Sequence, residues 1–308
     1  MIYASAVGFP LAEVFFIEKY IKVCYNNKKR GGCVRRSLFL LILLILCMLL
    51  LFCACSGEEE VVVPSSIDIL KIGKADCIII NTGTHLVMID TGEEENVDQI
   101  HAFMDEHSYD KVDTLILTHY DKDHIGGAKY VIENYGVETV IESCAIADTE
   151  EYNSYHQALN ALGKEPMKLT QDYTFKNDSC IFNINVPEKS KYDKKNDNNL
   201  SLVIAMKCGD NSFLFCGDAM SQRLEEVISE LPGEYDLIKL PHHGSYMENY
   251  REFFDKIKAP CTVMTTSKKN PADDRTILLL EELGITSYET RGGTVSVTTD
   301  GENVEIHQ

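Results

Sequence analysis

The sequence is poor in positive charge, and tryptophan is absent from it. Its 308 residues include 48 acidic and 29 basic ones. Residues 1–57 hold seven of the basic and two of the acidic residues, so the rest of the chain has 22 basic and 46 acidic residues, a net charge of −24. Nucleic-acid clamps obtain non-specific affinity from a broad basic face. The composition therefore argues against such a clamp, but not against an anionic substrate held locally by a metal ion.

Closely spaced cysteine pairs are also missing. Five of the eleven cysteines fall within residues 1–55, and the other six show no C-x-x-C spacing. Because most of these six stand in apolar runs typical of strands, we interpret them as small buried hydrophobic residues. They are Cys77, Cys144, Cys180, Cys208, Cys216 and Cys261. No internal repeat or low-complexity tract is present.

Charge is entirely absent from Ser37 to Cys55, "SLFLLILLILCMLLLFCAC". This run is close to the ~20 residues that span a bilayer as a helix. The basic cluster "KKRGGCVRR" before it predicts a cytoplasmic N-terminus, with the following chain outside the membrane. Two alternatives stay open, an uncleaved anchor and a lipoprotein signal whose end resembles a lipobox at Cys55. Both place the protein at the extracytoplasmic face of a bacterial cell membrane.

The chain divides into four predicted parts. Residues 1–36 form a basic segment that is long for the n-region of a signal peptide, so a misassigned start at Val34 is an alternative. Residues 37–55 form the membrane helix or lipoprotein signal, and residues 56–66 are an acidic and Pro/Ser-rich linker. Residues 67–308 are expected to form the ordered body, in which we find no further domain boundary.

The ordered body alternates apolar strand-like runs with amphipathic segments. Both of its halves are rich in strands and carry helices, which predicts an α/β (α+β) fold with sheets face to face and helices outside. Strands are expected within 67–92 (three), and at 111–117, 137–142, 179–186, 200–207, 212–217, 235–240, 259–266, 284–290, 294–299 and 303–307. Helices are expected at 94–107, 125–135, 149–163, 220–231 and 273–284.

Four metal-ligand side chains directly follow one predicted strand. "LTHYDKDHIGG" places His119, Asp121, Asp123 and His124 within six residues, where Gly126 and Gly127 allow a close backbone approach. Imidazole and carboxylate groups both bind Zn²⁺ well. The alternative, a polar turn with aspartates that cap a helix, does not explain four such residues at one strand end.

Two more predicted strands end in similar residues. "FLFCGDAM" leads to Asp218, and "LIKLPHHGS" leads to His242 and His243. Taken alone, Asp218 is equally well explained as a helix N-cap. A structural pair is the less favoured interpretation of the two histidines, because a histidine pair after a buried strand is more unusual. Three separate strand ends that stop in ligand residues support one another, and together they predict a shared metal site.

These motifs resemble a known family. H-x-D-x-D-H resembles the H-x-H-x-D-H signature of the metallo-β-lactamase superfamily. The match is closest to its ComEC-type subgroup, the soluble domain of DNA-uptake competence proteins and its stand-alone relatives. "ILKIGKADCIIINT" is similar to that subgroup's V-G-Q-G-D-A opening, and "LVMIDTG" to its I-D-T-G strand end. "NNLSLVIAMKCGDNSFLFCGDAM", "LPHHGS" and "NPADDRTILLLEELG" are similar to later motifs.

The resemblance implies a four-layer αββα sandwich with metal at the upper edges of the sheets. His119 and Asp121 would bind one ion, Asp123 and His124 a second, and Asp218 would bridge them. One histidine of the pair would complete the second site, and we favour His243. His242 would then be an acid or a substrate contact, and Asp90 would brace the loop. The implied ligand set is His119, Asp121, Asp123, His124, Asp218, His242 and His243.

The sequence departs from the superfamily pattern at two places. Asp121 stands where most members have histidine, as in the ComEC-type subgroup. The histidine of the third motif is missing, because Asn198 and Asn199 occupy its place and His156 lies in a predicted helix. We expect one or two divalent ions, with Zn²⁺ favoured and Mn²⁺ or Mg²⁺ an alternative at the nitrogen-poor site.

The resemblance implies metal-assisted hydrolysis, with Asp123 and His242 as catalytic residues. The expected bond is a phosphodiester, and the expected substrate a nucleic acid or an envelope polymer. A β-lactam substrate is disfavoured by the motif set. The alternative is a catalytically weak or inactive envelope-binding module that keeps the fold. No protein partner is inferred, and the natural substrate, the metal identity and the oligomeric state are not fixed by the sequence.

Overall fold

The computed structural model describes residues 44–45, 63–189, 192 and 197–308. Apart from Leu44 and Ile45, the predicted basic segment and membrane run lie outside the described residues, as does most of the predicted linker. None of the helices within the described part has the length and hydrophobicity of a membrane span. The membrane anchor therefore stays a prediction.

The first sheet has eight strands in the order β17-β16-β1-β2-β3-β4-β5-β6. Strands β3 to β6 run parallel to one another, and all other neighbouring pairs in this sheet are antiparallel. Its strands are β1 (Ser65–Ile69), β2 (Ile78–Asn81), β3 (Leu86–Ile89), β4 (Thr114–Leu117), β5 (Thr139–Ser143), β6 (Met167–Leu169), β16 (Val295–Thr299) and β17 (Val304–His307).

The second sheet has seven strands in the order β15-β14-β12-β10-β9-β8-β7. Strands β10, β12, β14 and β15 are parallel, and β7 to β10 form an antiparallel meander. Its strands are β7 (Tyr173–Asn177), β8 (Cys180–Asn185), β9 (Val203–Cys208), β10 (Asn211–Phe215), β12 (Leu237–Lys239), β14 (Cys261–Met264) and β15 (Thr286–Glu289). A separate pair joins β11 (Gly233–Glu234) to β13 (Ile257–Lys258).

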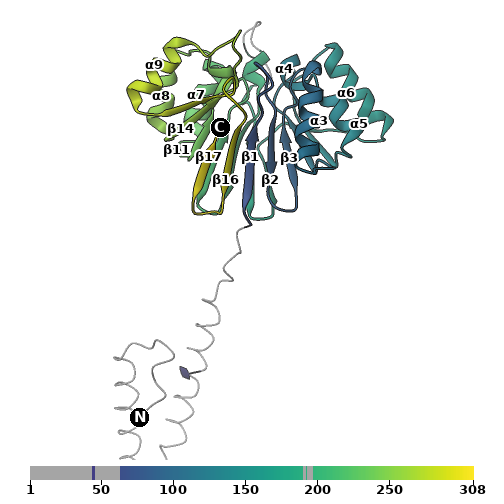
Figure 1. Ribbon diagram of the computed structural model, residues 1–308, viewed down its shortest axis with the longest axis horizontal. Helices are drawn as coiled ribbons and strands as arrows, with labels where there is room; N and C mark the ends of the chain where they lie inside the picture. Colours follow the sequence, from purple (N-terminus) through teal and green to yellow (C-terminus); the bar gives the residue numbers. More distant parts are fainter. Residues whose placement is uncertain (1–43, 46–62, 190–191, 193–196) are drawn as a thin grey trace, which may run out of the picture. The chain divides into compact units, whose positions relative to one another are not determined.

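Helices cover the outer face of each sheet, as Figure 1 shows. On the first sheet lie α3 (Val97–Glu106), α4 (Lys122–Ile125), α5 (Ala128–Asn134) and α6 (Glu150–Ala161). On the second lie α7 (Ser221–Glu230), α8 (Tyr250–Lys256) and α9 (Asp274–Leu283). Single-turn helices occur at η2 (Glu94–Asn96), η3 (Asp197–Leu200) and η4 (Pro241–Gly244).

Three apolar clusters hold the four layers together. One lies between the sheets and joins residues such as Ile67 and Ile80 of the first sheet to Phe182 and Phe213 of the second. The others fill the space between each sheet and its helices. The predicted α/β class, with face-to-face sheets and external helices, is thus confirmed for the described residues.

The elements missed by the sequence analysis are short or weakly patterned. They are β6, β7, α8, β11, β13 and the single-turn helices. The predicted helix 125–135 begins earlier, at Lys122, and is broken at Gly126 and Gly127 into α4 and α5. A Cβ atom on Gly127 would lie 2.4 Å from the Thr91 carbonyl oxygen, and one on Gly126 would lie 2.6 Å from the Glu94 nitrogen. The two glycines thus allow the close approach that was predicted.

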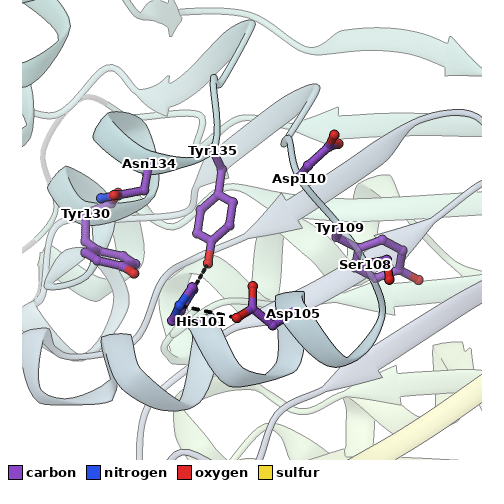
Figure 2. A pocket seen from close by; sticks show the side chains of 8 residues that line it. All are labelled: His101, Asp105, Ser108, Tyr109, Asp110, Tyr130, Asn134 and Tyr135. Carbon is purple, nitrogen blue, oxygen red and sulfur yellow. Dashed lines mark hydrogen bonds and ion pairs between the residues drawn. The ribbon is translucent and has the colours of Figure 1, made fainter.

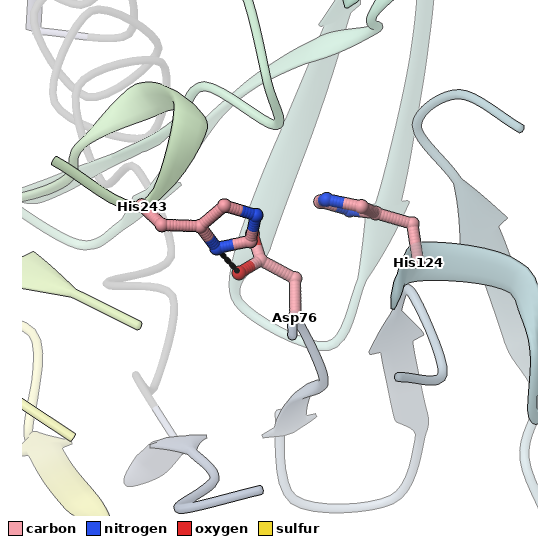
Figure 3. Close-up of side chains that lie close together, drawn as sticks. All are labelled: Asp76, His124 and His243. Carbon is pink, nitrogen blue, oxygen red and sulfur yellow. Dashed lines mark ion pairs between the residues drawn. The ribbon is translucent and has the colours of Figure 1, made fainter. Parts of the chain in front are cut away.

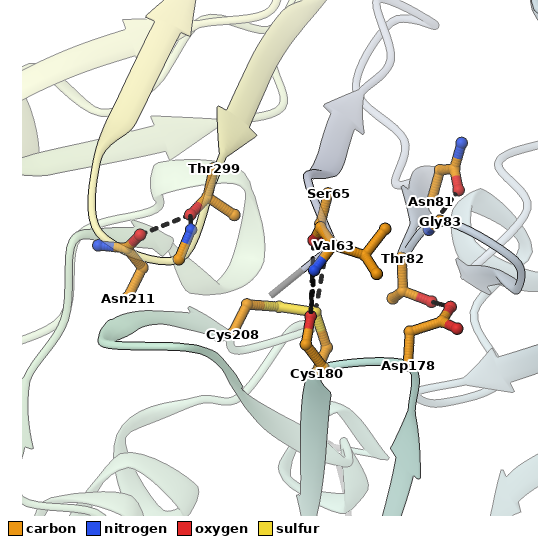
Figure 4. The surroundings of a disulfide bond; sticks show 12 residues. Val63, Ser65, Asn81, Thr82, Gly83, Asp178, Cys180, Cys208, Asn211 and Thr299 are labelled. Atoms are coloured by element: carbon orange, nitrogen blue, oxygen red, sulfur yellow. Dashed lines mark hydrogen bonds between the residues drawn. A yellow bond between two sulfur atoms is a disulfide. The ribbon is translucent and has the colours of Figure 1, made fainter. Parts of the chain in front are cut away.

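The interpretation of the six cysteines is wrong at two positions. Cys180 and Cys208 form a disulfide across the directly paired strands β8 and β9 (Figure 4). The sequence separation of 28 residues hid the pair, because only the register of the meander places the two opposite each other. Cys77 and Cys216 are buried thiols as expected, whereas Cys144 and Cys261 are partly exposed.

Candidate metal centre

Six residues of the candidate site follow the carboxyl ends of five strands. Asp90 follows β3, His119 follows β4 by one residue, and Asp218 follows β10. His242 and His243 come after β12, and Thr265 comes directly after β14. Parallel strands present their carboxyl ends along one edge of a sheet, which is where open α/β sheets place their binding residues. This topology gathers residues that are up to 175 positions apart in the sequence (Asp90 to Thr265).

Asp90 organises the loop that carries the first motif. It has a left-handed backbone with φ of 57°, and its side chain is fully buried. Its carboxylate accepts hydrogen bonds from the Thr118 nitrogen at 2.8 Å and the Thr118 hydroxyl at 2.7 Å. It also lies 2.7 Å from Nδ1 of His124. Asp90 therefore braces both ends of the motif, as the sequence predicts.

His119, His124 and Asp218 form one buried group of potential ligands. Nε2 of His124 lies 3.2 Å from Oδ1 of Asp218, and Nε2 of His119 lies 3.8 Å from Oδ2. Nδ1 of each histidine is already engaged, by Asp90 for His124 and by the Thr118 hydroxyl at 3.1 Å for His119. Because that hydroxyl donates its own proton to Asp90, it accepts from His119. Both imidazoles thus turn Nε2 towards Asp218.

His243 completes the group from the second sheet. Its Nε2 lies 3.4 Å from both Asp123 Oδ2 and Asp218 Oδ2. Its Nδ1 lies 2.8 Å from the Thr265 hydroxyl, which donates its proton to Asp76 and so accepts from His243. Figure 3 shows the imidazoles of His124 and His243 facing each other, with Asp76 beside His243.

The His242–His243 pair has an unusual backbone. Both residues adopt left-handed φ angles, 47° and 56°. Two consecutive non-glycine residues in this region cost about 1–2 kcal/mol each, and such strain gathers at functional sites. Nε2 of His242 lies 3.9 Å from Asp218, and its side chain is 26 % exposed, against 2 % for His243. His243 has the burial and the approach of a ligand, whereas His242 faces the group from its accessible side.

The residues that hold His243 lie outside the predicted set of site residues. Asp76 lies 3.3 Å from Nδ1 of His243 and 2.6 Å from the ammonium of Lys239. Asp76 forms a second potential ligand group with His124 and His243. Since its two oxygens already contact Lys239 and Thr265, we assign it to support rather than to metal binding. A lysine inside the apolar run "DLIKL" was the available signal, because an ionised side chain in a buried strand needs a partner.

The remaining predicted residues lie at the margin of the group. Asp121 is about half exposed, and its Oδ2 lies 3.8 Å from Nε2 of His119. Asp123 is 20 % exposed and reaches His243 as described. Asn198 donates to Oδ2 of Asp218 at 3.3 Å, so it fills the third-motif position. His156 does not join the group, because it lies on α6 and faces Glu142 at 3.3 Å.

Burial and the carboxylates set the protonation of these groups. Burial lowers the pKa of His119 to about 3, and burial lowers that of His242 as well. Burial also opposes protonation of His243, but Asp218 and Asp123 outweigh it and raise the pKa to about 10. The pKa of His124 is also raised, because the carboxylates of Asp218 and Asp90 outweigh the opposing effect of burial. The pKa of Asp218 is held well below its usual range by His243 and His124, against burial.

The group fits a divalent cation. Nε2 of His119, His124 and His243 and Oδ1 of Asp218 are buried atoms for which the described residues supply no hydrogen-bond partner. Buried polar atoms are rarely left without partners, and imidazole nitrogens with a carboxylate oxygen are the donor set that Zn²⁺ prefers. The outward Nδ1 contacts match the usual support of ligand histidines.

A separate cavity of about 460 Å³ lies on the outer helices, away from these residues (Figure 2). None of the seven predicted ligand residues lines it. In it the Tyr135 hydroxyl meets Nδ1 of His101 at 2.9 Å, and Nε2 of that histidine is 3.4 Å from Asp105. The cavity is lined by His101, Asp105, Ser108, Tyr109, Asp110, Tyr130, Asn134 and Tyr135.

An αββα sandwich with histidines and aspartates at its strand ends defines a class of metal-dependent hydrolase folds. Residues 71–157 match the family model described as the metallo-beta-lactamase superfamily. That region holds Asp76, Asp90 and the whole first motif. This match agrees with the resemblance to the superfamily that the motifs carry.

The chain resembles two curated proteins and a number of solved structures. ComE operon protein 3 of Bacillus subtilis (strain 168) is 27% identical over 161 residues, which are 52% of this chain and 20% of that protein. Recombination protein 2 of Haemophilus influenzae is 26% identical over 161 residues, 52% of this chain and 18% of that protein. These matches agree with the predicted ComEC-type subgroup. The aligned region is only about a fifth of each relative's length, so neither protein's whole activity transfers to this chain.

The solved structure supports the fold alone. The metallo-beta-lactamase fold protein YhfI from Bacillus subtilis has a TM-score of 0.50 and 10% sequence identity. The match covers 79% of this chain and 99% of that one.

Proposed function

We propose that the protein is a membrane-tethered, extracytoplasmic, metal-dependent hydrolase that cleaves a phosphodiester. The observation that carries the hydrolase proposal is the convergence on Asp218 of three Nε2 atoms that have no hydrogen-bond partner among the described residues. The phosphodiester rests on the relatives, whose names refer to the ComE operon and to recombination. A nucleic acid or an envelope polymer is the proposed substrate.

A bound divalent cation would lower the pKa of water from 15.7 to about 7 and so supply a nucleophile at neutral pH. His124, His243 and Asp218 would hold the ion, with Asp123 at its margin. A second, weaker ion would rest on His119, Asp121 and the Asn198 position, where oxygen ligands suit Mn²⁺ or Mg²⁺.

The protein's own residues have distinct roles in the reaction. Asp123 is partly exposed and close to His243, so its carboxylate would accept a hydrogen bond from the attacking water and orient it. His242 faces the group from the solvent side, and its neutral imidazole would donate a hydrogen bond to the leaving oxygen. The Nδ1 atoms of the three other candidate histidines are held from behind. Thr118 contacts His119, Asp90 contacts His124, and both Thr265 and Asp76 contact His243. These contacts keep the three Nε2 atoms directed inward.

The extracytoplasmic location is a proposal that rests on two features. The apolar run 37–55 with its preceding basic cluster predicts a tether that leaves the body outside the membrane. The Cys180–Cys208 disulfide supports this, because such bonds persist mainly in oxidising compartments.

The test is turnover of bis-p-nitrophenyl phosphate by purified protein loaded with Zn²⁺ or Mn²⁺. We expect hydrolysis that chelation abolishes, that metal restores, and that falls at least 100-fold in Asp123→Ala. An exposed aspartate far from the motif, Asp255, supplies the matched control Asp255→Ala.

The second candidate is an envelope-binding module without turnover. The specific observation in its favour is Asn198 at the third-motif position, where the superfamily pattern has histidine. Metal-loaded protein that is inactive on phosphodiester, ester and lactam substrates would support this candidate instead.

A further inference from the structure

Ser143 is a fully buried polar residue at the edge of the first sheet that carries the metal centre. It ends β5, which runs parallel to β4 with Glu142 opposite Leu117. The next residues along the two strands are Ser143 and Thr118, so Ser143 comes beside the start of the loop that carries His119. Its place in the fold puts Ser143 next to the candidate ligands, although it is not one of them.

The backbone of Ser143 holds the loop of the first motif. The Tyr120 hydroxyl donates to the Ser143 carbonyl at 2.5 Å, and both residues are buried. The Tyr120 ring also packs edge-on against that of Tyr152 on α6, with 4.8 Å between the ring centroids. Tyr120 stands between His119 and Asp121, which are the proposed ligands of the weaker ion. These contacts therefore fix the stretch of chain from which both ligands leave.

The hydroxyl of Ser143 holds the other half of the proposed weaker site. It donates to the Leu200 carbonyl at 2.9 Å. Leu200 is the last residue of η3, the single turn that also carries Asn198. From that turn, Asn198 donates to Oδ2 of Asp218 at 3.3 Å. The Ser143 hydroxyl thus helps to set where Asn198 stands against the metal centre.

The turn η3 has further contacts on both sides. The Arg223 nitrogen of α7 donates to the Asn199 side-chain oxygen at 3.1 Å. Just after η3, the Leu202 nitrogen donates to the Thr118 carbonyl at 3.0 Å, which is a bond between backbone atoms. Ser143 adds a side-chain link between η3 and the first sheet, and a substitution can remove that link without removing the backbone bond.

We propose that Ser143 is a positioning residue for the weaker metal ion, because it ties together the two loops that supply the ligands of that ion. Its carbonyl holds the first motif through Tyr120, and its hydroxyl holds η3 through Leu200. The inference rests on the proposed function, in which this ion is the second of two. Contacts behind metal ligands typically change metal affinity by about 10–100-fold, so the two hydrogen bonds of Ser143 should matter chiefly for this ion.

The test breaks each hydrogen bond separately. Ser143→Ala removes the hydroxyl that reaches Leu200 and keeps the carbonyl that Tyr120 contacts, whereas Tyr120→Phe removes the second bond alone. Protein loaded with one equivalent of Zn²⁺ is titrated with Mn²⁺, and the free Mn²⁺ is measured by electron paramagnetic resonance. We expect each variant to bind Mn²⁺ about 10–100-fold more weakly than the wild type, while the affinity for Zn²⁺, measured with a competing chelator, is unchanged.

Two matched variants control for the loss of a hydroxyl. Ser65 and Tyr235 each donate from the side chain to a backbone carbonyl. Ser65 begins β1 and Tyr235 precedes β12, so both lie at the ends of the sheets away from the metal centre. Ser65→Ala and Tyr235→Phe should keep the wild-type affinity for Mn²⁺. Urea unfolding of all four variants separates a loss of stability from a loss of metal binding.

The outcomes separate this inference from the proposed function. The role of Ser143 is overturned if either test variant binds Mn²⁺ like the wild type, if Mn²⁺ and Zn²⁺ affinities fall alike, or if the wild type takes up no second ion. In each of these cases, turnover of bis-p-nitrophenyl phosphate by the Zn²⁺-loaded wild type would leave the hydrolase proposal intact. Wild-type protein that cleaves no diester, with Mn²⁺ affinity still lost selectively in both variants, would remove the hydrolase and keep the role of Ser143.

Discussion

The ammonium nitrogen of Lys239 lies 2.6 Å from a carboxylate oxygen of Asp76, and both side chains are buried. Burial opposes ionisation of Asp76, but Lys239 and His243 hold its pKa well below its usual range. The ionised carboxylate can then accept the Thr265 proton, which leaves the Thr265 oxygen to fix Nδ1 of His243. A buried ion pair that joins β12 to the loop before β2 thus sets the direction of a candidate ligand.

Removing one partner of this pair should destabilise the protein more than removing both. Lys239→Met leaves the Asp76 carboxylate buried without its cation, and we expect the free energy of unfolding to fall by about 3–5 kcal/mol. Lys239→Met combined with Asp76→Asn should recover much of that loss, because no uncompensated charge remains. Urea unfolding of the wild type, both single variants and the double variant gives the coupling energy. If the double variant lost the sum of the unfolding free energies that the two single variants lose, the two side chains would act independently.

Histidine at position 198 should create a second tight zinc site. Asn198 lies beside Asp218 and offers only an amide, whereas an imidazole there would join His119 and Asp121. We expect Asn198→His to raise the zinc stoichiometry from about one tight ion to two per chain, measured after dialysis against a weak chelator. Asn153→His, at an exposed position on α6, controls for adventitious binding by the added histidine. An unchanged stoichiometry in Asn198→His would contradict the assignment of this position.

The buried carboxylate of Asp68 should make stability depend on pH. Burial raises its pKa above 3.8, although Ser296 opposes the shift. The folded state therefore holds the proton more tightly, and as pH rises through 3.8 the unfolded state ionises first and stability is lost. Asp68→Asn keeps an acceptor for Ser296 and removes this loss, so it should be the more stable protein at pH 7. Urea midpoints between pH 4 and 7 should show that advantage shrinking towards pH 4. If Asp68→Asn were more stable than the wild type by the same amount at every pH from 4 to 7, the raised pKa of Asp68 would be contradicted.

The disulfide should stabilise the fold without serving the metal centre. Cys180 begins β8 and Cys208 ends β9, at the opposite end of these strands from the loops that carry Asp218 and Asn198. Closing a loop of 28 residues limits the unfolded chain, and we expect Cys180→Ala/Cys208→Ala to lose about 3–4 kcal/mol of unfolding free energy. Zinc affinity at a temperature where both proteins are folded should be unchanged. A parallel loss of zinc binding would show that the bond supports the site as well.

Most of the fold and part of the site could be predicted from the sequence, for identifiable reasons. Long apolar runs such as "KVDTLIL" are buried as predicted, because both faces of a central strand are covered. Segments with weak patterns, such as β7 with its alternating partly buried residues, gave no clear signal. The first motif stood out because four ligand types follow one strand within six residues.

The supporting residues could not be predicted, since their roles depend on tertiary contacts. Asp76 and Thr265 are 189 positions apart and meet only because β14 lies across the sandwich from the loop before β2. The cysteine pair was hidden in the same way by the register of β8 and β9. A local sequence pattern can predict ligands that stand close together in the sequence. The residues that orient those ligands come from strand ends far apart in the sequence, so no local pattern predicts them.

The most direct test of the account is anomalous diffraction at the zinc edge from crystals of zinc-soaked protein. The account predicts a strong peak ~2.0–2.2 Å from Nε2 of His124, Nε2 of His243 and a carboxylate oxygen of Asp218. Absence of any peak within coordination distance of these three side chains, in protein that is folded and saturated with Zn²⁺, would contradict it.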